Sequence, residues 1–89
     1  MLTLQEEREH LIIAEQHITA GERRVAEQIL RIEEMDRRGE DTQAARGTLQ
    51  LLEETLEQWR GHRLLILDTI VRLALEPPRL CGADVPLTR

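Results

Sequence analysis

Residues 37–42, with the sequence RRGEDT, decide the fold because they interrupt an otherwise continuous helical pattern. The two arginines suit the C-terminal end of a helix, where the helix dipole favours cations. Gly39 suits the left-handed position that ends many helices, and Asp41 or Thr42 can cap the helix that follows. This stretch therefore predicts a short turn between two long helices, at about residues 3–38 and 42–75.

The outer ends of the two helices carry boundary signals of their own. Thr3 and Glu6 form a capping-box pattern, in which each side chain accepts a hydrogen bond from the backbone amide of the other residue. Pro77 and Pro78 end the second helix because proline lacks the amide hydrogen and clashes with the preceding turn. We therefore expect a helical hairpin over residues 1–76 and a flexible C-terminal tail over residues 77–89.

Apolar residues recur at heptad spacing in both segments. The first segment has one at every seventh position from Leu4 to Ile32, and the second alternates steps of three and four from Ala45 to Leu73. A heptad repeat of this length indicates the seam of a coiled coil, and the short turn makes the two helices antiparallel. The main positions of the predicted seam are Leu11, Ile18, Gly21, Val25, Leu52, Leu56, Trp59, Ile66 and Ile70.

The turn also sets the register of the pairing. A hairpin folded about residue 40 pairs positions whose numbers sum to about 80, which places Gly21 opposite Trp59 and leaves room for the indole ring. Arg63 interrupts the second seam, and we expect it to pair with Glu15 or Glu22 and so to fix the register. The remaining surface charges predict cross-helix ion pairs of Glu53, Glu54 and Glu57 with Arg23, Arg24 and Arg31.

A single seam is a thin core for two helices of this length, because ordering each residue costs on the order of 1–2 kcal/mol of backbone entropy. A second apolar stripe lies beside the seam at the open end of the hairpin. Soluble monomers rarely expose such a surface, so we expect a homodimer, most simply a two-fold four-helix bundle, or else a partner protein helix on the same stripe. The expected interface residues are Leu64, Leu67, Val71, Ala74, Ile12 and Ile13.

The composition argues against several functional classes. A net charge of −5 and a single aromatic residue disfavour nucleic-acid binding, which needs cationic surface and stacking side chains. Cys81 is the only cysteine and suits a reducing compartment, and no apolar run is long enough for a membrane span, so we expect a cytoplasmic protein. The sequence has no catalytic or cofactor-binding motif, so we expect neither enzymatic activity nor a cofactor.

Acidic and histidine side chains provide two alternatives to a pure interaction module. Glu7 and His10 form a Glu-x-x-His pattern, which projects two metal ligands from one side of a helix in bundles that hold metal ions. His10, His17 or His62 could instead accept a phosphoryl group, although the chain lacks the lysine that commonly accompanies such sites. We therefore predict a non-enzymatic interaction and oligomerisation module, with a metal-binding bundle or a histidine phosphocarrier as alternatives.

Several stretches resemble a group of short, uncharacterised bacterial proteins. They are AEQHITAGERRVAEQ at residues 14–28, RGEDT at 38–42, LLEETL at 51–56 and the pair His62-Arg63. The resemblance covers about residues 10–67 and is most specific at the turn and at the Gly-Glu-Arg motif. It implies a helical hairpin in a bacterial cytosol and brings no activity and no functional residues.

Overall fold

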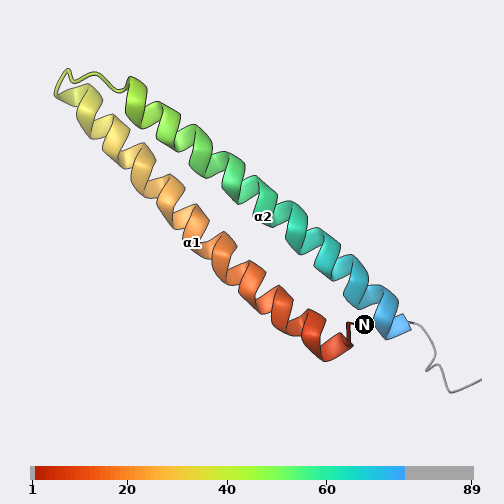
Figure 1. Ribbon diagram of the computed structural model, residues 1–89. Helices are drawn as coiled ribbons and strands as arrows, with labels where there is room; N and C mark the ends of the chain where they lie inside the picture. The colour runs from red at the N-terminus through yellow and green to blue at the C-terminus, as the bar shows by residue number, and fades with distance from the viewer. Residues whose placement is uncertain (1, 76–89) are drawn as a thin grey trace, which may run out of the picture.

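The chain reverses direction at the turn that the sequence predicts (Figure 1). In the computed structural model, which describes residues 2–75, Gly39 has a φ of 73°. Its amide donates to the carbonyl of Asp36 at 3.0 Å, and the amide of Glu40 donates to the carbonyl of Met35 at 2.9 Å. These two bonds form a Schellman motif, which satisfies the last carbonyl groups of the first helix. Glycine takes the left-handed conformation here without the strain that a side chain would add.

Two antiparallel helices make up the described part of the chain, in which no strand occurs. Helix α1 comprises Leu4–Arg37 and helix α2 comprises Gln43–Leu75. Their limits lie within one residue of those expected from the sequence. At a rise of ~1.5 Å per residue each helix is about 50 Å long, and the start of α1 lies beside the end of α2 (Figure 1). The fold is therefore an all-α helical hairpin.

Side chains at both helix starts satisfy the free backbone amides. At α1 the capping box is complete, since Thr3 Oγ1 accepts from the Glu6 amide at 3.1 Å and Glu6 Oε1 accepts from the Thr3 amide at 2.9 Å. At α2 the carboxylate of Asp41 accepts from the Gln43 amide at 3.0 Å. The start of each helix is thus encoded locally, before any contact between the helices is made.

The core between the helices is thin. Within residues 2–75 the only buried apolar side chains are Ala14, Ile32, Leu56 and Ile66, and Glu7 is buried among the polar ones. Two helices in one layer can cover only the facing stripe of each partner, so most of the seam stays partly accessible. The half-buried positions of the predicted seam are Leu11, Ile18, Gly21, Val25, Leu52, Trp59 and Ile70.

Two further sequence expectations concern the limits of this hairpin. The expected tail over residues 77–89, which includes Cys81, lies outside the described residues and stays a prediction. Between residues 2 and 75, neither helix has a segment with both the length and the apolar character needed to cross a bilayer.

Candidate interaction faces

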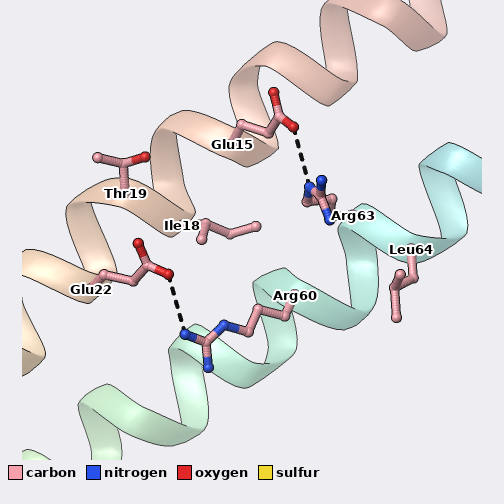
Figure 2. Close-up of a pocket in the computed structure, with 7 residues that line it drawn as sticks. All are labelled: Glu15, Ile18, Thr19, Glu22, Arg60, Arg63 and Leu64. Carbon is pink, nitrogen blue, oxygen red and sulfur yellow. Dashed lines mark hydrogen bonds and ion pairs between the residues drawn. The ribbon is translucent and has the colours of Figure 1, made fainter.

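Ion pairs join the two helices along one edge of the hairpin. The Arg63 Nε donates to the Glu15 carboxylate at 3.2 Å, and the Arg60 guanidinium donates to the Glu22 carboxylate at 3.3 Å (Figure 2). The predicted pairing of Arg63 with Glu15 is therefore confirmed. All four side chains are 40–54% exposed, so each pair contributes at most about 1 kcal/mol and serves mainly to align the helices.

An open depression of about 550 Å³ lies between the helices along this edge. Leu64 lines it together with both ion pairs and Ile18 (Figure 2). Ile12 lines a neighbouring depression that shares Glu15 with the first, which places Ile12 on the same side of the molecule. Apolar side chains from both helices therefore gather on one side of the hairpin.

This side carries several exposed apolar side chains at the open end, away from the turn. Leu67, Val71 and Ala74 follow Leu64 at steps of three and four residues, the spacing that keeps side chains on one face of a helix. Leu64 is 63% exposed, Ile12 55% and Val71 51%, whereas Leu67 is half-buried. We call these five residues the open-end apolar face: Ile12, Leu64, Leu67, Val71 and Ala74.

Ile13 belongs to a different surface from its neighbour Ile12. It is 48% exposed, but it follows Ile12 by one residue and so lies about 100° further around α1, turned away from Glu15. The expectation that Ile13 contributes to the same interface as Ile12 stays a prediction, since both lie at the open end of the hairpin but on different sides of α1.

Gly21 accommodates Leu56 instead of the predicted Trp59. A Cβ atom built on Gly21 would lie 3.1 Å from the Leu56 Cδ1, and all three of its nearest neighbours belong to Leu56. The observed register is therefore displaced by one seam position from the predicted one. The close approach at Gly21 remains, but it is made by an aliphatic side chain.

Trp59 instead takes part in an aromatic cluster with two histidines on the edge opposite the ion pairs. The imidazole of His17 stacks on the indole with ring centroids 4.1 Å apart and an interplanar angle of 7°. His62 meets the same indole edge-on at 5.6 Å. From the sequence these histidines are expected to be exposed polar side chains, with phosphate acceptance as an alternative, and a stack on Trp59 is not among the expectations. A pairing register in which the facing residue numbers sum to slightly less than 80 would have predicted the stack, because it places position 17 opposite position 59.

The predicted ion pairs of three arginines with three glutamates are not formed within residues 2–75. Glu57 instead approaches Arg60 of its own helix at 3.7 Å. The reason is geometric, because antiparallel helices bring like edges of their heptads together. Arg24 and Arg31 share the histidine edge of α1, since they follow His17 at heptad spacing, while Glu53 shares the ion-pair edge of α2 with Arg60.

Glu7 and His10, the candidate metal ligands, contact each other. The Glu7 Oε2 lies 3.2 Å from the His10 Nδ1, and the Glu7 side chain is 4% exposed against 49% for His10. The pair is thus a buried carboxylate that orients a surface imidazole. Within residues 2–75, no cluster of three potential metal-binding side chains occurs.

Comparisons with protein-family models, with curated proteins and with solved structures give no significant match to this chain. The resemblance to short bacterial proteins therefore stays a prediction. A function for this chain must therefore be inferred from the open-end apolar face and from the chemistry of the side chains around it.

Proposed function

We propose that this chain is a non-enzymatic interaction module that acts as a homodimer, in which the open-end apolar faces of two hairpins dock to form a four-helix bundle. The observation that carries the proposal is the exposure of Ile12, Leu64 and Val71 on one side of a hairpin with a thin core. Large exposed apolar side chains gathered on one side of a molecule mark interaction sites on soluble proteins. A two-fold dimer would cover the face on both copies at once.

The strength of such a dimer can be bounded from the same residues. Full burial of a leucine, isoleucine or valine side chain contributes ~1.5–3 kcal/mol, so covering half-exposed side chains contributes about 1 kcal/mol each. Five residues on each of two copies give a gain of the same order as the cost of association, which is ~4–15 kcal/mol. We therefore expect a reversible dimer that dissociates on dilution.

Light scattering on matched variants tests this proposal. Leu64→Glu places a charge on the open-end apolar face and should convert the dimer to a monomer of 10.3 kDa. Leu51→Glu is the control, because Leu51 also lies on α2 and is 65% exposed, close to the 63% of Leu64, but it lies outside this face. A wild-type chain that is monomeric while fully helical would contradict the proposal, and would leave the face to a helix of another protein.

The setting that we propose for this module is the bacterial cytoplasm. The single Cys81 supports it, because a lone cysteine suits a reducing compartment. The resemblance of residues 14–28 to short bacterial proteins points to the same setting.

A metal-binding bundle is the second candidate, and the burial of Glu7 beside His10 is the observation that favours it. A carboxylate that holds one imidazole nitrogen leaves the other free to bind a metal ion, as in many metal centres. Elemental analysis of protein purified without an affinity tag tests this candidate. Stoichiometric iron, manganese or zinc that disappears in Glu7→Ala would favour metal binding, whereas metal-free protein in both forms would exclude it.

A further inference from the structure

The open-end apolar face covers only half of its side of the hairpin. Toward the turn, the same edge of α2 carries Glu57 and Glu53, which precede Leu64 and Arg60 by one heptad each. Both glutamates are exposed, and the Glu57 side chain is 76% accessible. On this side α2 is therefore apolar near the open end and carries two glutamates toward the turn, of which Glu57 lies 3.7 Å from Arg60.

We propose that two copies of this chain pair antiparallel through their open ends alone, with the two-fold axis passing near Ile12 and Leu67. The inference rests on the proposed dimer and specifies its geometry. Ile12 and Leu67 lie at the same level along the long axis of the hairpin. The reason is that Glu15 and Arg63, which follow them by about one helical turn toward the loop at Gly39, are directly paired. A two-fold axis at this level packs α1 against α1 of the second copy and α2 against α2 of the second copy.

The order of residues along each helix fits this axis. On α2, Leu67 meets Leu67 of the second copy. Leu64 meets Val71 of the second copy, because residues at equal distances on either side of an antiparallel axis face each other. On α1, the axis at Ile12 brings Arg8 toward Glu15 of the second copy, which adds a pair of opposite charges. Arg8 precedes Glu15 by one heptad and so lies on the same edge. Leucine and valine therefore meet near the axis, and arginine meets glutamate. At the rim of the contact, Arg60, which is already paired with Glu22, comes to the level of Ala74 of the second copy.

The other two-fold arrangements place charge against charge or charge against apolar surface. A parallel dimer, with the open ends side by side, sets Glu57 of one copy over Glu22 of the other, because these positions lie at nearly the same height. A fully overlapped antiparallel dimer brings Glu57 close to its own counterpart and covers the apolar face with the half of α2 that carries the glutamates. The pairing of open ends keeps Glu57 of one copy away from both Glu22 and Glu57 of the other.

Disulfide trapping in a Cys81→Ser background tests the geometry. Leu67→Cys lies at the proposed axis, so mild oxidation should convert most of the chain to a covalent dimer. Glu57→Cys is the matched control on the same edge of α2, about 15 Å further along the helix, and it should stay largely uncrosslinked. Sedimentation of the reduced proteins accompanies both measurements.

Each outcome separates the two proposals. Efficient trapping through Leu67→Cys alone supports the open-end geometry. Trapping through Glu57→Cys instead, or a reduced dimer that neither cysteine traps, overturns this geometry while leaving the dimer itself standing. Monomers in every reduced sample, with no trapping at either position, would overturn the proposed function as well.

Discussion

The imidazole of His17 lies parallel to the indole of Trp59, with ring centroids 4.1 Å apart. This contact joins α1 to α2 at the chain's only tryptophan, so Trp59 fluorescence reports directly on the closed hairpin. Stacked aromatic pairs stabilise by about 0.5–1.5 kcal/mol beyond the area they bury. The stack and the ion pairs lie on opposite edges, and together they hold the register from both sides.

Replacing His17 by alanine should therefore lower the free energy of unfolding by about 1 kcal/mol and change the Trp59 emission spectrum. Urea unfolding followed by circular dichroism and by fluorescence measures both effects. His62→Ala is the control, because the edge-on contact at 5.6 Å leaves the parallel stack in place and should cost less. Equal losses for both variants would mean that the stack has no special role.

The glycines within the helices should respond differently to alanine. Gly61→Ala adds a methyl group where nothing lies within 4 Å, so the gain in helix propensity of about 0.5–1 kcal/mol should appear in full as a higher melting temperature. Gly21→Ala should gain less or lose stability, because its Cβ would lie 3.1 Å from Leu56. A larger gain at Gly21 than at Gly61 would contradict the close helix approach described here.

Gly39→Ala should destabilise the hairpin by roughly 1–2 kcal/mol, because its φ of 73° strains a residue with a side chain. Gly47→Ala, in α2 and with open space around its Cβ position, is the matched control and should be neutral or stabilising. Thermal unfolding of the two variants in parallel measures the difference. Unchanged stability in Gly39→Ala would indicate that the turn does not depend on the left-handed residue.

The buried carboxylate of Glu7 should limit stability. Glu7→Leu extends the apolar seam at a position that is 3% exposed, and it should raise the melting temperature because no charge then needs to be buried. Glu7→Gln keeps the shape and serves as the control. A loss of stability in Glu7→Leu would show that the contact with His10 contributes more than apolar packing at the same position.

Most of the hairpin could be predicted from the sequence because its determinants are local. The capping box at Thr3, the glycine at position 39 and the carboxylate of Asp41 each act within a few residues of their own position. Heptad spacing then identified the facing sides of both helices. Such signals do not depend on how the helices meet, so they fix the elements and their direction.

The register and the edges were harder to predict because they depend on where the two helices come to rest. A displacement of one seam position replaced Trp59 by Leu56 opposite Gly21 and brought His17 onto the indole. The predicted ion pairs of Arg24 and Arg31 do not form for a related reason, since antiparallel helices bring like heptad edges together and these arginines lie on the histidine edge. Assigning each charged residue to an edge of its heptad would have avoided that error.

Sedimentation velocity over a hundredfold dilution series of the unmodified chain, with circular dichroism recorded on the same samples, decides whether the hairpin dimerises. We expect a species of twice 10.3 kDa at high concentration that dissociates on dilution. A fully helical monomer at every concentration, with the open-end apolar face in contact with solvent, would contradict it.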